Sequence, residues 1–208
     1  MRRSKTVTEE AARVEYVPPD VTQPLPLAEL FPAPAPLELD LGCGDGSFLA
    51  ALAAMHPERN CLGVERLLGR VRTACRRIAV QRLTNVRILR VDIAHAAATL
   101  IPLASVDVCH VMFPDPWPKR RHHVRRTVTA DFLRAISRIL KPSGLLRLTT
   151  DDAPYFEQMQ AAAAAVPAFE TVNEESVPSL PRSTFESRFV ESGVAIQRLV
   201  LRNVSPPR

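Results

Sequence analysis

The sequence predicts an α/β fold in which a mostly parallel sheet carries helices on both faces. Three observations support this prediction. From residue 37 onward, short apolar runs alternate with stretches of helical periodicity, the pattern of strands joined by crossover helices. Carboxylates stand where the expected strands end, which is typical of a ligand site at one edge of a sheet. The chain has 208 residues, of which 46% are hydrophobic, and this suits one globular domain.

The chain is expected to divide at residue 36 into an N-terminal arm and a main domain. Residues 1–36 hold seven prolines between Pro18 and Pro36, too many for a helix or a central strand. We therefore expect a proline-rich, irregular arm over 1–36 and a single domain over 37–208.

Strands are expected where apolar residues cluster over about four to eight positions. They cover residues 37–41, 61–65, 86–91, 106–113, 145–149 and 196–201. Helices are expected from residue 47 to near residue 56, around 67–78 where apolar residues recur at helical spacing, and over 131–140 and 155–165. Residues 141–144 are expected to close the third helix as a turn, and the proline-rich segment 114–127 forms a loop.

Five acidic residues lie at the ends of successive expected strands. They are Asp40, Glu65, Asp92, Asp115 and Asp151. Ligands of parallel sheets bind outside the carboxyl ends of the strands, and a carboxylate near a sheet edge is costly without a partner. These five residues therefore mark the expected site.

A glycine turn after the first strand supplies the expected cofactor site. Gly42, Gly44 and Gly46 have no Cβ to keep a ligand away from the backbone. Their G-x-G-x-G spacing differs from the G-x-G-x-x-G of dinucleotide sites, and the flanking acids Asp40 and Asp45 would repel a phosphate. These acids suit a ligand with an amino group and a sulfonium cation, and S-adenosylmethionine has both.

The next two acids extend this site. Glu65 follows Gly46 by 19 residues, near the spacing at which an acid binds ribose hydroxyls in nucleotide-binding folds. Asp92 ends the following strand and is placed to reach the adenine. The alternative is a tight structural turn with unrelated surface acids.

The positive charge is concentrated in two segments. The chain has 27 Lys and Arg against 22 Asp and Glu, and only three of the cations are Lys. Residues 66–90 hold eight Arg and no acid, and residues 115–126 hold five Lys or Arg against one Asp. Clustered arginine favours a polyanionic partner. For the first segment a solvated helix face is the alternative, whereas the second follows no helical period and favours phosphate contacts.

The sequence argues against several classes of protein. No apolar run approaches the roughly 18 residues of a membrane span, and no apolar stretch follows Arg2 and Arg3 as in a secretory signal. The four cysteines form no CxxC pair, which disfavours a zinc site or a disulfide framework and is typical of a reduced cytoplasm. His122 and His123 lack further ligands at metal-binding spacing, so no metal is expected.

The segment after the fourth expected strand carries the most specific signal. It reads Phe-Pro-Asp-Pro-Trp-Pro-Lys over 113–119 and continues through a His- and Arg-rich tail to residue 126. Pro114 and Pro116 restrict the backbone on both sides of Asp115, and Trp117 either stacks on a base or packs the loop. The segment resembles the signature of the bacterial tRNA (guanine-N7-)-methyltransferase family. The similarity extends over residues 37–202 and includes the glycine turn, 63–65, 150–151, Tyr155 and 184–186.

The resemblance implies a Rossmann-like class I methyltransferase fold with a seven-stranded sheet, and an S-adenosylmethionine-dependent methyltransferase domain over 37–208. It implies methyl transfer from S-adenosylmethionine to a variable-loop guanine of tRNA, giving 7-methylguanosine, in a cytoplasmic monomer or homodimer. Asp40, Glu65, Asp92 and Asp115 match the family's cofactor positions, and Asp115 also matches its catalytic position. The matches to its substrate and RNA positions are Lys119, Arg121, His122, His123, Arg125, Arg126, Asp151, Ser183, Thr184 and Glu186.

Two of these positions depart from the family pattern. Asp40 stands where Glu is usual, so its reach to a cofactor amine depends on water, and Ser183 stands where Thr is usual. Two alternatives stay open. One is an enzyme that methylates an exocyclic base nitrogen, and the other is a catalytically silent RNA-binding subunit of the same fold. A small-molecule or protein methyltransferase is disfavoured by the arginine-rich loop.

Overall fold

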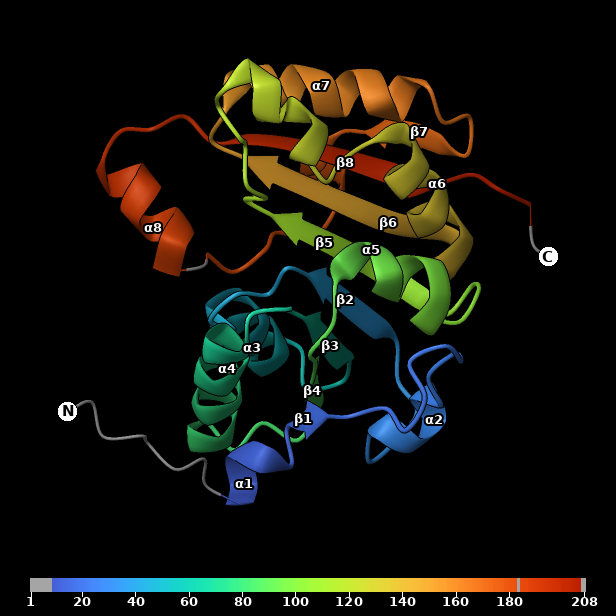
Figure 1. Ribbon diagram of the computed structural model, residues 1–208, viewed down its shortest axis with the longest axis vertical. Coiled ribbons are helices and arrows are strands. Elements are labelled where there is room, and N and C mark those ends of the chain that lie inside the picture. The colour runs from blue at the N-terminus through green and yellow to red at the C-terminus, as the bar shows by residue number, and fades with distance from the viewer. Residues whose placement is uncertain (1–8, 183, 207–208) are drawn as a thin grey trace.

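The computed structural model, which describes residues 9–182 and 184–206, is built around an eight-stranded sheet of order β1-β4-β3-β2-β5-β6-β8-β7 (Figure 1). Neighbouring strands are parallel except that β8 is antiparallel to both β6 and β7. The strands are β1 (Glu15–Tyr16), β2 (Leu37–Leu41), β3 (Asn60–Val64), β4 (Val86–Leu89), β5 (Val106–Met112), β6 (Leu140–Thr150), β7 (Phe169–Val172) and β8 (Gln197–Asn203).

Helices connect most of these strands. The α-helices are α1 (Glu9–Ala12), α2 (Leu27–Leu30), α3 (Ser47–Met55), α4 (Leu68–Val80), α5 (Ile93–His95), α6 (Ala130–Ile139), α7 (Ala153–Ala164) and α8 (Thr184–Glu191). A π-helical turn (Ala96–Leu100) continues α5, and short 3-10 helices cover Arg120–Arg125 and Glu174–Ser176. Within the described ranges, none of the helices has the length and apolar character required to span a membrane.

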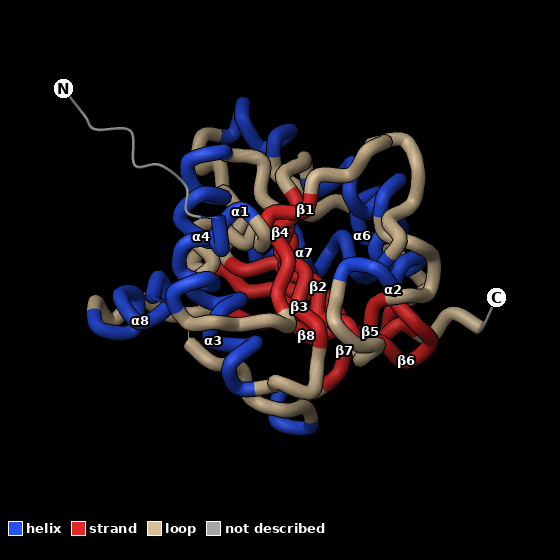
Figure 2. The backbone as a smooth tube through the Cα atoms, turned by 90° about the horizontal axis from the view of Figure 1, so that it is seen from below, coloured by secondary structure: helices blue, strands red, loops and turns tan. Residues whose placement is uncertain are grey.

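The two faces of the sheet bury different clusters of apolar side chains. Alternate residues of β2 point to opposite faces, so that Leu39 and Leu41 pack in one cluster with residues of α2, α6 and α7. The second cluster contains Phe48 of α3, Val71 of α4 and Ala11 of α1. Figure 2 shows α3 and α4 on one side of the strands and α2 and α6 on the other. The predicted arrangement of helices on both faces is therefore confirmed.

The predicted mostly parallel sheet is also confirmed, with differences in detail. The six segments predicted as strands correspond to β2, β3, β4, β5, β6 and β8, but the sheet has eight strands instead of seven. The additional strand β1 is two residues long, and β7 has no buried residue to give it an apolar pattern. The turn expected at 141–144 belongs to β6, because Leu140 already pairs with Val106 before the register shifts.

Several helices begin at or beside a side chain that accepts a hydrogen bond from the first turn, whereas α2 and α4 have no side-chain cap. Asp45 accepts from the backbone N–H of Ser47 at 3.0 Å, just at the start of α3. Thr129 caps α6 through Phe132, at 3.2 Å, and Asp152 caps α7. The helices predicted from residue 47, over 131–140 and over 155–165 correspond to α3, α6 and α7.

The segment from residue 9 to residue 36 packs against both faces of the sheet. Ala11 is buried beside α3 and α4, and Leu25, Leu30 and Phe31 are buried on the opposite face. Leu25 donates a backbone hydrogen bond to the carbonyl of Leu100 at 2.8 Å. The division of the chain at residue 36 stays a proposal.

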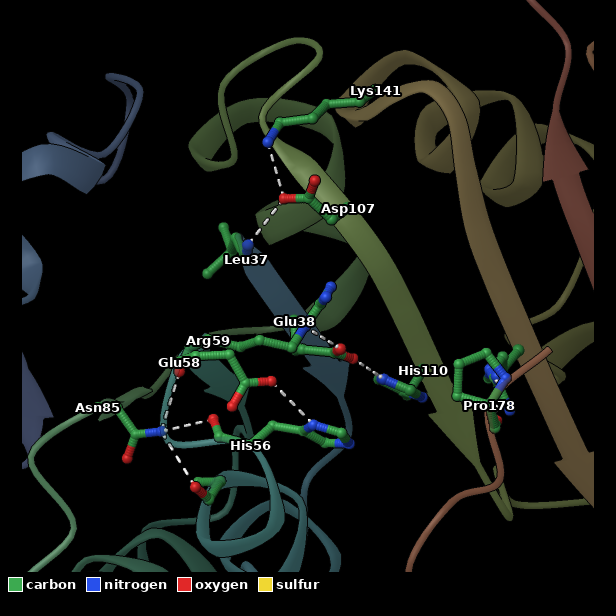
Figure 3. Close-up of polar contacts among 12 residues, drawn as sticks. Leu37, Glu38, His56, Glu58, Arg59, Asn85, Asp107, His110, Lys141 and Pro178 are labelled. Carbon is green, nitrogen blue, oxygen red and sulfur yellow. Dashed lines mark hydrogen bonds and ion pairs between the residues drawn. The ribbon is translucent and has the colours of Figure 1, made fainter. Parts of the chain in front are cut away.

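A buried polar cluster joins strands β2 and β5. Glu38 Oε2 lies 2.5 Å from Nε2 of His110, and Glu38 Oε1 lies 2.6 Å from Nε of Arg59 (Figure 3). Burial acts to raise the pKa of Glu38, but the hydrogen bond and charge of His110 and the charge of Arg59 outweigh it and lower the pKa. In the same view, Asp107 Oδ2 accepts hydrogen bonds from the backbone of Leu37 and from Lys141. These contacts fix β2 against β5.

Candidate active site at the carboxyl ends of the strands

A pocket of about 490 Å³ lies at the carboxyl ends of β2, β3, β4 and β5, where the sequence predicts a site. Successive strands run outward from β2 in both directions, so this is the point at which ligands bind in open α/β sheets. Three of the five strand-end acids line the pocket, namely Glu65, Asp92 and Asp115. The other two, Asp40 and Asp151, are not among its lining residues.

Glu65 follows β3 and is held in place by its own turn. It is 5% exposed, and its Oε1 accepts a hydrogen bond from the backbone N–H of Leu67 at 2.8 Å. Arg70 Nη1 lies 3.8 Å from Oε2. One carboxylate oxygen is thus committed to the backbone, and the second stands in the pocket with a distant cation.

Asp92 begins α5 and lies on the far side of the pocket from Asp115 along the sheet order. Its Oδ1 accepts hydrogen bonds from the backbone N–H groups of Ala94 and His95, at 2.9 and 3.3 Å. This cap fixes the direction of the side chain. Because the helix begins here, Asp92 and Ile93 form one wall of the pocket.

Asp40 lies in β2 next to the pocket residues Leu41 and Gly42, and its carboxyl group is buried in an electrostatically unfavourable position. It is 1% exposed, and its Oδ1 has no hydrogen-bond partner within the described part of the chain. Burial, and after it the neighbouring Glu65 carboxylate, raise the pKa of Asp40 to about 7. A buried carboxylate oxygen without a partner is costly, so the arrangement favours a cation or a donor group close by.

The glycines of the turn serve two different purposes. Gly42 (φ +89°) lines the pocket, and a Cβ there would meet no atom within 4 Å, so the space beside it is open. Gly46 (φ +73°) instead permits α3 and α4 to approach, because a Cβ there would lie 2.7 Å from the Cβ of Ala74. Gly44 meets only the carbonyl of Gly42, at 3.9 Å. Of the three predicted ligand-facing glycines, the pocket therefore contains Gly42.

The loop after β5 brings Asp115 and Trp117 to the pocket. Phe113 and Trp117 adopt positive φ angles of 50° and 45°, which are uncommon for aromatic residues and aim the loop back over the strand ends. The Trp117 ring lies 4.9 Å from the guanidinium of Arg125 and meets the His122 ring edge-on at 5.8 Å. Of the two interpretations of Trp117, these contacts support packing of the loop.

Arg126 is buried and anchors this loop, whereas the sequence predicts that it contacts RNA. It is 4% exposed, and its Nε donates a hydrogen bond to the carbonyl of Pro116 at 2.6 Å. Its Nη1 donates to Gln158 at 2.9 Å, and the guanidinium stacks 4.7 Å from the centre of the Tyr155 ring. All of these partners are internal. We therefore correct the prediction that Arg126 grips a phosphate.

The other cations of the loop are available at the surface. Lys119, Arg121 and Arg125 are exposed, and Arg125 also lines the pocket. His122 accepts a hydrogen bond from Arg121 Nε at 3.3 Å, provided that its Nε2 carries no proton. His123 is half-buried.

The remaining predicted substrate residues lie on β6 and α8. Asp151 directly follows β6 and is half-buried. Glu186 is 4% exposed and accepts a hydrogen bond from Arg198 of β8. Thr184 begins α8, and Ser183 lies outside the described residues.

The acids of the pocket suit a ligand that carries a positive charge and hydroxyl groups. Three carboxylates line it together with the arginines Arg66, Arg70 and Arg125, and a fourth carboxylate, Asp40, is buried with an unpartnered oxygen. Carboxylates accept hydrogen bonds and stabilise positive charge. Over residues 9–182 and 184–206, no group of three or more His, Cys, Asp or Glu has the arrangement to hold a metal ion. All four cysteines are free and buried.

Sequence reasoning did not assign several lining residues to the site. They are Arg66, Leu67, Arg70, Ile93, Met112 and Thr127. Arg66 and Arg70 belong to the arginine-rich segment 66–90. The sequence indicates that this segment is positively charged, but not that these two residues reach the pocket. The apolar residues Leu67, Ile93 and Met112 carry no functional group that would indicate a site, and they line the pocket only because they lie near the strand ends.

Comparisons with known proteins agree with this geometry. A family profile described as "Putative methyltransferase" matches residues 34–199. A tRNA (guanine-N(7)-)-methyltransferase from Alkalilimnicola ehrlichii is 37% identical over 91% of this chain and 81% of its own length. Proteins of the same name are 36% identical in Treponema pallidum, over 80% of this chain and 67% of theirs, and 42% identical in Leifsonia xyli, over 71% and 65%.

Solved structures share the fold at low sequence identity. The aminoglycoside-resistance methyltransferase NpmB1 has a TM-score of 0.58 and 20% identity, over 81% of this chain and 87% of that one. TrmN from Thermus thermophilus has a TM-score of 0.59 and 20% identity, over 82% of this chain and 44% of that one. At this identity the likeness establishes the Rossmann-like methyltransferase architecture.

Proposed function

The chain belongs to the tRNA (guanine-N7-)-methyltransferase family, and from that premise we propose that it methylates N7 of a variable-loop guanine in tRNA, giving 7-methylguanosine. The methyl donor in this proposal is S-adenosylmethionine, which supplies an electrophilic methyl group on a sulfonium cation. The observation that carries the proposal is the convergence of Glu65, Asp92 and Asp115 from three strand ends on one pocket. The three carboxylates suit the amino group and the sulfonium cation of this donor, and Arg66, Arg70 and Arg125 line the same pocket beside them.

The acids of the pocket are assigned to parts of the donor by position. Glu65 has one oxygen free of backbone contacts and accepts hydrogen bonds from the ribose hydroxyls. Asp92 and the adjoining Ile93 wall hold the adenine. Asp40, whose Oδ1 has no partner in the described chain, stabilises the donor's amino group from below. The side chain of Asp40 does not line the pocket, so a water bridges it to that group.

Asp115 is the proposed catalytic residue. The N7 atom of guanine carries an in-plane lone pair, so no proton has to leave before it attacks, and the reaction requires no metal to create the nucleophile. The enzyme's task is then to align nucleophile, methyl carbon and leaving sulfur. Asp115 accepts hydrogen bonds from the N–H edge of the guanine, orients the base, and offsets the positive charge that grows on the ring.

The exposed cations of the loop hold the tRNA. Lys119, Arg120, Arg121 and Arg125 are proposed to contact phosphates, with Arg126 holding the loop from inside. Phosphate contacts fix the position of an RNA, and a folded RNA is recognised largely by its shape. Asp151 and the segment 183–186 are proposed substrate contacts from the resemblance, in a monomer or homodimer.

The proposal is tested by methyl transfer from labelled S-adenosylmethionine to tRNA transcripts. One transcript carries the variable-loop guanine and a matched transcript has adenine there. We expect label only in the first. Equal labelling of both transcripts, or labelling of neither, would contradict the proposed function.

A further inference from the structure

Arginines stand on a second side of the pocket mouth, away from the loop. Arg66 and Arg70 line the pocket from the chain that follows β3, whereas Arg125 lines it from the loop that follows β5. Strands β3 and β5 flank β2 in the sheet (Figure 1), so the two groups of cations come from chain segments on opposite sides of the carboxyl end of β2.

Helix α4 carries this positive charge away from the pocket along the surface. The helix contains four arginines and no acid, and Arg66 precedes it by two residues. Its apolar residues are buried against α3 and the sheet, which leaves the arginines on the outer side. The exposed ones are Arg66, Arg70 and Arg72, and Arg76 is half-buried.

Most of these cations have no acid to balance them. Arg77 pairs with Asp45 at 2.8 Å, and Arg70 lies 3.8 Å from Glu65. Within the described chain, Arg66, Arg72 and Arg76 have no carboxylate oxygen within 4 Å. Neighbouring like charges on a helix are mutually destabilising, and an ordinary solvated helix mixes both signs. The arrangement indicates a polyanionic partner.

The charge of the donor helps to decide which of the two substrates these arginines bind. S-adenosylmethionine has a net positive charge and a single carboxylate, so a row of arginines that continues along α4 beyond the pocket serves the other substrate. A nucleic acid that presents one base to Asp115 must bring its flanking phosphates past both sides of the mouth. One side is formed by the Arg120–Arg125 loop, and the other by α4.

We propose that Arg66, Arg70, Arg72 and Arg76, here called the α4 arginine surface, form a second phosphate-binding surface for tRNA. The strand that carries the target guanine crosses the pocket between this surface and the loop. The inference rests on the proposed function, because it names a further part of the same substrate's footprint. Of the two interpretations of the arginine-rich segment, it favours nucleic-acid binding over a solvated helix face.

The test uses the full chain with Arg72→Gln and Arg76→Gln combined. Neither residue lines the pocket, and Arg70 is left intact because it lies near Glu65. The matched control is Arg138→Gln, an exposed arginine of α6 on the opposite face of the sheet. Dissociation constants for tRNA are measured over a series of NaCl concentrations, and donor affinity is measured by calorimetry.

We expect the double variant to bind tRNA about tenfold more weakly, with the magnitude of the log affinity against log salt slope reduced by about 1.4 to 1.8. Its KM for tRNA rises in parallel, while donor affinity and the melting temperature match those of the control. A slope and dissociation constant equal to those of Arg138→Gln would overturn the α4 arginine surface. If the wild-type chain itself fails to methylate tRNA, the proposed function fails instead, so the two failures are distinguishable.

Discussion

The guanidinium of Arg126 donates a hydrogen bond from Nε to the carbonyl oxygen of Pro116, 2.6 Å away. A residue at the end of the loop 114–127 thus fastens a residue near its beginning, directly between Asp115 and Trp117. The same side chain reaches Gln158 of α7 and stacks on Tyr155. The loop that carries the proposed catalytic carboxylate is therefore tied to the helix layer by one buried cation.

This tie predicts that Arg126→Gln lowers kcat for methyl transfer by about 10- to 100-fold, because a small displacement of Asp115 is costly in an alignment-limited reaction. The salt slope of tRNA binding should remain that of the wild type, since the guanidinium faces inward. Arg125→Gln is the matched comparison, and should reduce the slope by about 0.7 to 0.9. Kinetics and binding titrations on both variants distinguish the roles, and a reduced slope for Arg126→Gln would assign that residue to the RNA.

Asp115→Asn tests the catalytic assignment. The amide keeps the size of the side chain but removes the charge that offsets the cationic base, so kcat should fall by about 100-fold or more. Donor affinity, measured by calorimetry, should change by less than about threefold, because Glu65, Asp92 and Asp40 still hold the donor. Near-normal turnover in this variant would remove Asp115 from the mechanism.

Asp40 links donor binding to pH. Its pKa in the folded chain is about 7, well above that of an unfolded aspartate. Donor affinity of the wild type should therefore fall as the pH drops below about 7 and the carboxylate takes up a proton. Asp40→Asn should bind the donor more weakly at pH 8 and show a flatter profile from pH 6 to 8. Identical pH profiles for the two proteins would exclude Asp40 from donor binding.

In the absence of the donor, the ionisation of Asp40 at high pH should lower the stability of the folded chain, whereas it strengthens donor binding. Because the folded chain holds a proton that the unfolded chain has lost, this group's contribution to the free energy of unfolding is complete below the unfolded pKa and is lost as the pH rises through about 7. Asp40→Asn removes that loss, so its melting temperature should exceed that of the wild type by roughly 5 °C at pH 8. The gain should shrink toward pH 5. A variant that melts below the wild type at pH 8 would contradict the burial argument.

Gly46 is predicted to be required for packing instead of ligand contact. Gly46→Ala places a Cβ 2.7 Å from the Cβ of Ala74 at a positive φ of 73°, and should lower the free energy of unfolding by about 2–4 kcal/mol. In the double variant with Ala74→Gly, the contact between the two Cβ atoms is absent but the positive φ angle remains. The loss in free energy of unfolding should therefore be about 1–2 kcal/mol smaller than the sum of the losses of the two single variants. Urea titrations of the four proteins measure this coupling, and strict additivity would refute the proposed contact.

Much of the fold follows from local patterns in the sequence. The strand at 37–41 and the helix start at Ser47 agree with the structure, because the patterns of apolar residues that predict them act over a few residues. The edge strand β7 escapes prediction, since an edge strand without buried residues has no apolar pattern. The hydrogen bond between Glu38 and His110 joins residues 72 positions apart, and no local rule connects them.

Three of the five predicted acids and the predicted Arg125 line the candidate site, whereas Arg66 and Arg70 were not assigned to it. Glu65, Asp92 and Asp115 meet in one pocket because parallel strands end at the same edge. Arg126 stands in a run of basic residues that all look alike in sequence, and only the path of the loop buries it. Likewise Gly46 shares a motif with Gly42, although one meets α4 and the other meets open space.

The proposed function is tested most sharply by the chemical identity of the methylated nucleoside that the purified chain makes. Labelled tRNA from the methyl-transfer reaction is treated with borohydride and aniline, which cleave the chain at 7-methylguanosine. We expect cleavage at the variable-loop guanine, and loss of that product with Asp115→Asn. Labelled tRNA that resists cleavage, with the methyl group on an exocyclic base nitrogen, would contradict the proposed methylation of N7.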